Sequence, residues 1–369
     1  MTDVNLGIDV AACRTRQGRL LEVMRQLRVD LAVITQNVHI QYLVGPRYEW
    51  TFSPAAALTA DGRLTLIAPV EPKQPVAADD VRTYEAKSFS TLRNDQRHNS
   101  TRVLLDALAQ HKPSRLGVEF SSCGPEITTR LGGELVDIEP ELYTLRRKKD
   151  PDELARLRKA IAGTAAMHHR AREIVKPGIN ELEVFSELQA AAVREYGEML
   201  TGTGNDYASG AHGGPPRDRK IEAGELYILD LGPAFRGYFA DNTRVIAVGG
   251  KPTDEQVQTW QHILPVFEMI EKTVKPGKSC QELFKEAYAW LNQSKLGKFE
   301  HHLGHGIGLF PHEAPHLNPF WDDTFQVGEV FAVEPGLYGP TLNAGIRLEN
   351  NYLVTETGVE LLTPVPIEL

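Results

Sequence analysis

Two segments of the sequence each carry a pair of carboxylates in a pattern that predicts a β-hairpin. In Tyr227–Val245 (YILDLGPAFRGYFADNTRV), Asp230 and Asp241 lie at equal distances from a point between Phe235 and Arg236. A turn there would place the two aspartates directly opposite each other, with Cβ atoms about 4.5–5.5 Å apart. Two like charges at this distance repel each other unless something neutralises them. A bound divalent cation is the obvious neutraliser.

The second segment, VGEVFAVEPGLYGPTLNAGIRLENNYLVT, carries Glu334 and Glu349, which are symmetric about a point between Thr341 and Leu342. The histidines of HHLGHGIGLFPHE, which lies between the two segments, are His301, His302, His305 and His312. Four carboxylates and a central histidine form an oxygen-rich ligand set for one or two hard-to-borderline divalent metals.

Acidic residues in hairpins usually belong to a solvated strand face. Asp230, however, alternates with Leu226 and Ile228 on one face of its predicted strand, and Glu334 alternates with apolar neighbours in the same way. A carboxylate that points inward needs a partner, so metal ligation is the favoured interpretation. His305 stands between two glycines, where backbone can approach closely.

An internal repeat predicts how these residues are positioned. IVKPGINELEVFSEL (174–188) resembles TVKPGKSCQELFKEA (273–287), with the VKPG stretches 99 residues apart. Each copy continues into a predicted helix and then a histidine, His212 in the first and His312 in the second, with carboxylate hairpins in the same order. Two copies suggest a pseudo-two-fold domain with a site at the junction of its halves.

The preceding part of the chain reads as a smaller α/β domain. Helices are predicted at 14–28, at 101–110 and in a short segment before residue 134. Strands are predicted at 31–35, 116–120 and 134–138, and a hairpin that turns at Asp61-Gly62 is predicted in 55–69. The helices alternate with the strands, which is typical of an α/β domain. It has no glycine-rich phosphate loop. Asp150-Pro151 marks the start of a new helix, which predicts domains over residues 1–145 and 146–369. The basic cluster Arg146–Lys149 is interpreted as a solvated approach to that helix.

Composition limits the classes of function. The 369 residues carry a net charge of −9 and no Lys/Arg run that suggests a nucleic-acid partner. No apolar stretch is long enough to span a membrane, and no secretory signal is visible. Three cysteines far apart in sequence support neither a disulfide framework nor a thiolate site. We expect a cytoplasmic enzyme.

These motifs resemble the creatinase/aminopeptidase P/prolidase/methionine aminopeptidase superfamily, most closely a bacterial Xaa-Pro dipeptidase or aminopeptidase. The segments that carry the resemblance are LRRKKDPDELARLRKA (145–160), DLGPAFRGYFADNTR (230–244), GHGIGLFPHEAP (304–315), VEPG (333–336) and GIRLEN (345–350). It covers residues 145–369 well and reaches the first domain more weakly, through HIQYLVG (39–45). It implies a small creatinase-type N-terminal α/β domain followed by a "pita-bread" α/β catalytic domain.

The resemblance also implies roles for individual residues. The ligands of a dinuclear metal centre would be Asp230, Asp241, His305, Glu334 and Glu349, with Asp241 and Glu349 bridging the metals. His212 and His312 would be non-ligand histidines of the substrate cleft. Apart from the resemblance, we interpret His301 and His302 as wall residues of the cleft, with His301 binding substrate. Arg347 is expected on the other face of its strand from Glu349, supporting the pocket and the substrate. Mn²⁺ suits this set, with Co²⁺, Zn²⁺ and Fe²⁺ as alternatives.

Three functions follow from the resemblance. The first is hydrolysis of Xaa-Pro bonds in small peptides by a metal-bridging hydroxide, with Glu334 as proton shuttle and with an N-terminal domain that restricts the cleft and contributes to a homodimer. The second is a non-peptidase hydrolase or lyase of the creatinase, ectoine hydrolase or dimethylsulfoniopropionate lyase type. It is kept because Gly-Ala-His around His212 resembles creatinase. The third, a binding module without catalysis, is disfavoured because all five ligand positions are occupied.

Overall fold

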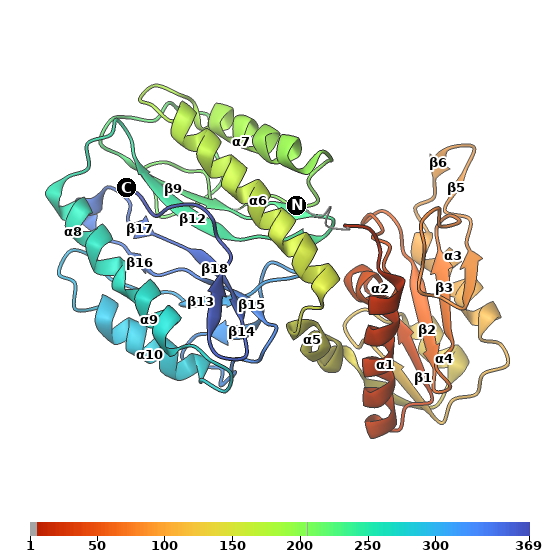
Figure 1. Cartoon of the computed structure of the whole chain (residues 1–369). Helices are drawn as coiled ribbons and strands as arrows, with labels where there is room; N and C mark the ends of the chain where they lie inside the picture. Colours follow the sequence, from red (N-terminus) through yellow and green to blue (C-terminus); the bar gives the residue numbers. More distant parts are fainter. Residues whose placement is uncertain (1–5, 205) are drawn as a thin grey trace. The chain divides into compact units, whose positions relative to one another are not determined.

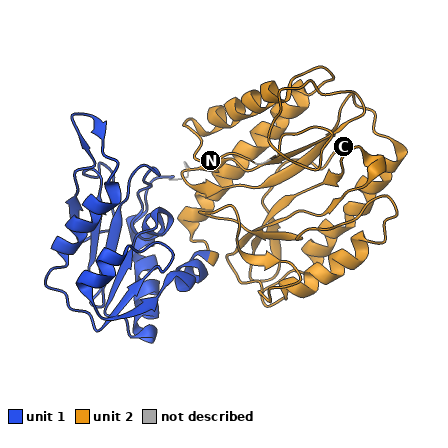
Figure 2. Cartoon of the chain, turned by 180° about the vertical axis from the view of Figure 1, so that it is seen from behind, with its two compact units in different colours: residues 1–146 blue, residues 147–369 orange. Residues whose placement is uncertain are grey.

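The computed structural model describes residues 6–204 and 206–369, which divide into two compact units, residues 1–146 and 147–369 (Figure 2). The boundary falls near the end of helix α5 (Glu139–Arg147). Among the described residues, none of the helices has the length and hydropathy that a membrane crossing requires. Both units mix helices and strands, as the sequence predicted.

The N-terminal unit is built on one sheet with strand order β4-β3-β2-β1-β7-β8. Strand β1 pairs parallel with β7 and antiparallel with β2. The strands of the sheet are β1 (Leu31–Ile34), β2 (Ala55–Thr59), β3 (Leu64–Ala68), β4 (Asp80–Thr83), β7 (Arg115–Val118) and β8 (Glu134–Asp137), and a small hairpin joins β5 (Lys87–Ser88) to β6 (Thr91–Leu92). The helices before α5 are α1 (Val10–Leu27), α2 (Asn37–Val44), α3 (Gln96–Ala107) and α4 (Pro125–Leu131).

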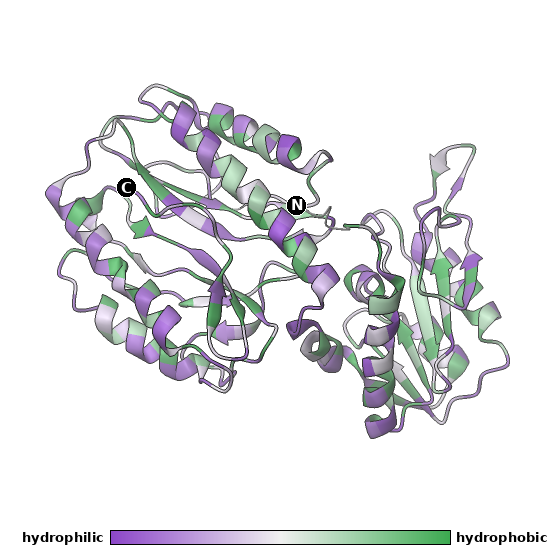
Figure 3. Ribbon diagram, viewed as in Figure 1, coloured by the Kyte–Doolittle hydropathy of each residue, from purple (hydrophilic) through white to green (hydrophobic). Residues whose placement is uncertain are grey.

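Helices cover both faces of this sheet. Helices α1 and α2 lie on one side and α3 and α4 on the other (Figure 1). The α3–α4 side packs Leu104 and Ile127 against Val33 and Val118 of the strands. In Figure 3 the strands between the helices are coloured mainly as hydrophobic, whereas the helices alternate between hydrophilic and hydrophobic residues. The predicted strands and the hairpin about Asp61-Gly62 are confirmed, although α1 and α3 begin four to five residues earlier than predicted.

The C-terminal unit arranges two groups of helices around a centre of strands (Figure 1). Its helices are α6 (Pro151–Ile174), α7 (Glu181–Tyr196), α8 (Asp254–Ile263), α9 (Pro265–Thr273) and α10 (Cys280–Leu291), with the 3₁₀ turn η1 (Pro340–Leu342). Its strands are β9 (Leu226–Leu231), β10 (Ala234–Phe235), β11 (Tyr238–Phe239), β12 (Asn242–Ala247), β13 (Gly304–Gly306), β14 (Glu313–Leu317), β15 (Val330–Val333), β16 (Gly336–Leu337), β17 (Ile346–Arg347), β18 (Asn350–Val354) and β19 (Val359–Leu361). They pair as β9–β12, β10–β11, β16–β17 and a sheet of order β14-β13-β15-β18-β19.

The internal repeat is visible in this unit. Helices α6 and α9 both end before a VKPG stretch, and α7 and α10 both begin after it. Gly178 and Gly277 have φ of 90° and 87°, a conformation that favours glycine. The next helix is capped by Asn180 or Ser279, whose side-chain oxygen accepts a backbone N–H of the first turn. The two halves therefore repeat the same local structure, as predicted.

The first predicted hairpin forms, but with a different register. Asp230 pairs with Thr243, not with Asp241. The turn is centred on Arg236-Gly237, both with positive φ (49° and 86°), one residue further along the chain than predicted. This is the backbone conformation of a two-residue type I′ turn, which matches the twist of the flanking strands. Asp241 thus sits diagonally from Asp230 on the same face, where side chains still reach each other.

The second predicted hairpin has the predicted register. Strand β15 pairs with β18 through Val333 and Asn350, and β16 pairs with β17 through Gly336 and Arg347. Glu334 lies between Val333 and Gly336, and Glu349 lies between Arg347 and Asn350. The two glutamates are therefore opposite each other in this register. The turn contains η1, at the predicted centre.

The expectation that the basic cluster is solvated was wrong. Arg146 and Lys149 are buried. The Arg147 guanidinium lies 2.9 Å from Asp323 and 2.6 Å from Glu329, and Lys149 Nζ lies 3.0 Å from Glu313. Arg147 and Lys149 are thus matched by carboxylates far away in the sequence, which the local pattern could not reveal, whereas Lys148 is exposed as expected.

Close packing of α6 against α7 depends on Gly163. A Cβ at this position would overlap the ring of Tyr196, whose hydroxyl donates to the Ala160 carbonyl at 2.9 Å.

We expect Gly163→Ala to destabilise the chain by about 1–3 kcal/mol, because overpacking forces a shift of the helices. Gly18, in α1, has nothing within 4 Å of the same position. Gly18→Ala should therefore stabilise by about 0.5–1 kcal/mol. Urea unfolding of both variants checks this, and equal signs would contradict it.

His168 ties α6 to β12 beside Asp241. Its Nε2 donates to the backbone oxygen of Asn242 at 3.1 Å, and burial, followed by the charge of Arg244, lowers its pKa to about 3. Because an unfolded histidine has a pKa of about 6.5, the unfolded chain binds this proton first as the pH falls. The neutral imidazole therefore contributes stability above pH 6.5 that is lost on acidification.

We expect the free energy of unfolding to fall by about 2 kcal/mol more in the parent than in His168→Gln between pH 7 and pH 5. Urea titrations across that range provide the measurement. His111→Gln, at an exposed position in the N-terminal unit, is the control. Parallel curves for parent and His168→Gln would rule out this contribution.

Candidate metal centre

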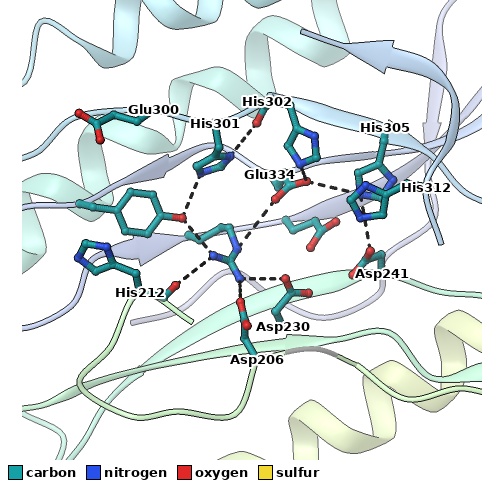
Figure 4. A pocket seen from close by; sticks show the side chains of 13 residues that line it. Asp206, His212, Asp230, Asp241, Glu300, His301, His302, His305, His312 and Glu334 are labelled. Carbon is teal, nitrogen blue, oxygen red and sulfur yellow. Dashed lines mark hydrogen bonds and ion pairs between the residues drawn. The ribbon is translucent and has the colours of Figure 1, made fainter. Parts of the chain in front are cut away.

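The predicted site residues line one cavity of about 470 Å³ in the C-terminal unit (Figure 4). The lining residues are Asp206, His212, Asp230, Asp241, Glu300, His301, His302, His305, His312, Glu334, Tyr338, Arg347 and Glu349. Every predicted ligand and cleft residue is among them. The strands of both hairpins and β13 converge here, so the two halves of the repeat each contribute carboxylates.

Asp241, His305 and Glu349 form the innermost group. All three are buried, and one potential ligand atom of each lies within 4.8 Å of the other two. His305 Nε2 lies 3.6 Å from Asp241 Oδ2. Glycines on either side of His305 make this possible, because a Cβ at Gly304 or Gly306 would collide with the backbone carbonyl of Ala332 or Ala314. The close approach predicted for these glycines is therefore confirmed.

The backbones of Asp241 and Glu349 are fixed reciprocally. Asn242 and Arg244 donate to the Glu349 carbonyl, and Asn351 donates to the Asp241 carbonyl. Arg244 is itself held by the carbonyl of Val365 at 2.6 Å. Each hairpin thus anchors the carboxylate-bearing residue of the other.

Glu334 contacts two histidines. Its Oε1 lies 2.7 Å from His302 Nε2 and 3.5 Å from His305 Nε2. Burial acts to raise the pKa of Glu334, but the hydrogen bonds from the two histidines outweigh it and hold that pKa well below its usual range. Burial likewise acts to lower the pKa of His302, and the contact with Glu334 raises it. Glu334 is therefore a carboxylate at neutral pH.

Asp230 is paired with Arg347. The Arg347 guanidinium lies 2.8 Å from Asp230 Oδ2 and also pairs with Asp206. Asp206 in turn accepts the Gly214 backbone N–H at 2.6 Å, two residues after His212. One guanidinium thus connects a predicted ligand to the loop that carries a predicted cleft histidine.

Arg347 faces the same cavity as Glu349, so its expected position on the other strand face was wrong. Residues two apart along an extended chain point to the same side. The predicted role of Arg347 in supporting the pocket is compatible with this position.

The donor set suits divalent cations. Asp230 Oδ1, Asp241 Oδ1 and Glu349 Oε1 are buried and have no hydrogen-bond partner among the described residues. Burial and then neighbouring carboxylates raise the pKa of Asp241 and of Glu349 well above their usual range. Buried, unpartnered oxygens that repel one another are what a cation would stabilise. The residues present therefore fit a metal centre of carboxylate and imidazole ligands.

The remaining histidines form the wall of the cavity. The His312 ring stacks on His305 with centroids 3.7 Å apart, and burial, followed by the charge of His305, lowers its pKa to about 4. His212 is exposed and packs its ring against Tyr338, with centroids 4.9 Å apart. His301 Nε2 lies 3.1 Å from the Tyr338 hydroxyl, which also accepts from Arg347 at 3.1 Å.

The sequence interpretation missed Asp206, Glu300 and Tyr338 and gave His302 no specific contact. Tyr338 could have been found, since Glu334, Gly336 and Tyr338 alternate onto one face of an extended segment. Asp206 follows no periodic pattern, because it lies in an irregular loop in which its own backbone forms an isolated bridge to Asp230 of β9.

Comparisons with known families and structures agree with this architecture. The Metallopeptidase family M24 matches residues 155–356, and the Creatinase/Prolidase N-terminal domain matches residues 16–148. Among solved structures, the prolidase from Pyrococcus horikoshii superposes with a TM-score of 0.82 at 24% identity, covering 96% of this chain and 99% of that one. Dipeptidase PepE from Mycobacterium ulcerans gives a TM-score of 0.79 at 25% identity and 98% coverage of both chains.

Relatives in sequence carry the name uncharacterized peptidase. One from Staphylococcus epidermidis is 33% identical over 233 residues, which are 62% of this chain and 65% of that relative, just under two thirds of its length. Another from Staphylococcus aureus is 27% identical over 369 residues, with 95% of this chain and 99% of that relative covered. The predicted resemblance and the pita-bread fold are thereby confirmed. Because the M24 match spans more than half of the chain and contains every residue that lines the cavity, this chain belongs to metallopeptidase family M24.

Proposed function

We propose that this protein hydrolyses Xaa-Pro bonds in small peptides, using two divalent cations held by Asp230, Asp241, His305, Glu334 and Glu349. The observation that carries the proposal is the set of three buried, unpartnered carboxylate oxygens around His305. The names of its structural neighbours, which include an Xaa-Pro dipeptidase from Bacillus anthracis and an aminopeptidase P from Escherichia coli, support the choice of bond.

The cavity is suited to peptide hydrolysis without a side-chain nucleophile. Bound cations would supply an activated water and polarise the scissile carbonyl. A volume of about 470 Å³ is within the usual range of small-molecule pockets. The cavity therefore accommodates a short peptide.

Glu334 is the candidate proton carrier. The histidine contacts keep Glu334 ionised at neutral pH, so it is available to accept a proton from a water that bound cations would have made more acidic. The proton can then pass to the leaving nitrogen of the substrate. His302, 2.7 Å away, orients the carboxylate during this transfer.

His212 and His312 are candidate donors to the carbonyl oxygen as negative charge develops on it. His312, with a pKa of about 4, is a neutral imidazole at pH 7 and can donate one N–H without bringing a charge. A fixed donor at a position where charge develops lowers the barrier more than it strengthens substrate binding.

For the metal we propose Mn²⁺, with Co²⁺, Zn²⁺ and Fe²⁺ as alternatives, because four carboxylates and one imidazole form a mainly oxygen ligand set. From the family resemblance we also propose a cytoplasmic homodimer whose N-terminal domain (1–145) restricts access to the catalytic domain (146–369).

A non-peptidase hydrolase or lyase on the same fold is the second candidate. It is favoured by the Gly-Ala-His stretch around His212, which resembles creatinase. His212 lies at the wall of the cavity against Tyr338 and is not one of the proposed metal ligands, so a change at this position would act on substrate choice.

A hydrolysis panel distinguishes these functions. We expect Mn²⁺-loaded protein to cleave Xaa-Pro dipeptides or Xaa-Pro-Yaa tripeptides, with activity abolished by chelation, and to leave Met-Ala peptides intact. Preference for dipeptides or for tripeptides assigns the dipeptidase or the aminopeptidase P type. No cleavage of any peptide by protein shown to contain metal would overturn the proposal and favour the second candidate.

Asp241→Asn tests the metal centre directly. We expect lower metal content and a loss of turnover of at least about 100-fold. Replacing a residue that only hydrogen-bonds to a metal ligand lowers metal affinity or activity by up to about 100-fold, and replacing a ligand should have a larger effect. Metal analysis and hydrolysis rates provide the measurements. Asp322→Asn, at an exposed position outside the cavity, is the matched control and should change neither. Full metal content and turnover in Asp241→Asn would exclude Asp241 as a ligand.

A further inference from the structure

The N-terminal unit contains a second cavity, of about 360 Å³. Its lining residues are Thr35, Gln36, Asn37, Val38, Trp50, Phe52, Ser53, Pro54, Ala55, Arg97, Ser100, Thr101, Ser122, Gly124 and Ile127. All of them belong to the N-terminal unit, so this cavity is separate from the candidate metal centre.

The cavity lies where the sheet topology opens a crevice. Thr35 directly follows β1, and Ser122 follows β7, its parallel neighbour. The chain leaves β1 into α2, on the side of α1, and leaves β7 into α4, on the side of α3 (Figure 1). Connections that depart to opposite faces leave a gap at the carboxyl ends of adjacent parallel strands, which is where open α/β sheets bind ligands.

Arg97 places a positive charge in the lining of this cavity, whereas the carboxylates of Glu119 and Glu139 lie behind the lining and are already bonded to Thr35, Gln36 and Ser122. Arg97, Ser100 and Thr101 lie on one face of α3, at the spacing of i, i+3 and i+4. Among the described lining residues Arg97 is the charged one, and no described carboxylate forms an ion pair with it. The guanidinium is therefore free to meet an anion.

Ser100 supplies a second, independent indication of a ligand. Ser100 is one of the lining residues and is 2% exposed, and its buried Oγ has no hydrogen-bond partner among the described residues. A buried hydroxyl without a partner is unfavourable. An acceptor atom of a ligand beside Arg97 would satisfy it.

The floor of the cavity is fixed in advance. Glu119, fully buried, accepts from the Thr35 N–H at 2.6 Å, from the Gln36 N–H at 2.9 Å and from Ser122 Oγ at 3.2 Å. His39 Nδ1 lies 2.5 Å from its other oxygen. These bonds join the segment after β1 to the segment after β7, so the crevice is held open without a ligand.

We propose that this cavity binds a small molecule with one carboxylate on an aromatic body. The carboxylate would pair with Arg97 and accept from Ser100, and the body would lie against Phe52 and Trp50. Trp50 is 90% exposed, which leaves its ring free to cover a ligand. The carboxylate can belong to a free organic acid or to the C-terminus of a peptide, since both present the same group to Arg97.

The test is a titration of the full-length, metal-loaded protein, followed by tryptophan fluorescence and calorimetry. The probes are phenylacetate, N-acetyl-glycyl-phenylalanine and phenylacetamide, the last a neutral analogue of the first. We expect saturable binding of at least one carboxylate and none of the amide. Tighter binding of phenylacetate assigns the site to a free acid, and tighter binding of the blocked dipeptide to a peptide C-terminus.

Variants distinguish this site from the metal centre, which could also bind a carboxylate. Arg97→Gln should weaken binding by about tenfold or more, because a charge-assisted hydrogen bond is lost. Arg102→Gln, at an exposed position of α3 outside the cavity, is the matched control. Trp50→Phe should remove the fluorescence change but keep the heat of binding. No saturable binding, or equal affinity in Arg97→Gln and the parent, would overturn the proposal.

Discussion

The concentration of negative charge inside the C-terminal unit is the constraint on which the site depends. Asp230, Asp241, Glu334 and Glu349 are all buried around one cavity. An isolated buried carboxylate is strongly unfavourable, and the surrounding cationic groups compensate only part of the charge. Arg347 pairs with Asp230, and His302 pairs with Glu334, which leaves Asp241 and Glu349 with raised pKa values. The remaining imbalance must be met by protons or by bound cations, and only cations leave the carboxylates available as ligands.

The fold keeps this unfavourable group in place by holding its backbone, because the side chains themselves repel. Thr243 donates to Glu349 Oε2 at 2.7 Å, and the carbonyls of Asp241 and Glu349 are each bound by a side chain of the opposite hairpin. Both hairpins follow the same VKPG–helix unit, so the repeat delivers two equivalent strand pairs to one centre. The packing of helices outside the strands therefore stabilises the geometry of the site as well as the core.

The sequence predicted those parts of the site that depend on alternation and symmetry. The pairing of Glu334 with Glu349 was predicted correctly because their hairpin is symmetric about its turn. The predicted partner of Asp230 was wrong because the type I′ turn lies at Arg236-Gly237, which shifts the register of that hairpin. Contacts between distant segments could not be predicted. Arg147 and Lys149 resemble a solvated cluster locally, yet their carboxylate partners follow more than 160 residues later. Asp206 has no regular structure to reveal it.

Charge also constrains which peptide the cavity can accept. A dipeptide brings an ammonium and a carboxylate into the same small volume, and the exposed Glu300 carboxylate suits the ammonium. Its carboxylate finds Arg347 already paired with Asp206 and Asp230. If cations at the metal centre neutralise Asp230, the hold on the guanidinium weakens and Arg347 can turn to the substrate. A longer peptide has a neutral peptide group where the dipeptide has its carboxylate, so Arg347 can stay paired with Asp206 and Asp230. Under the proposed function, the choice between dipeptidase and aminopeptidase therefore depends on how strongly Asp206 retains Arg347 once the metal ions are bound.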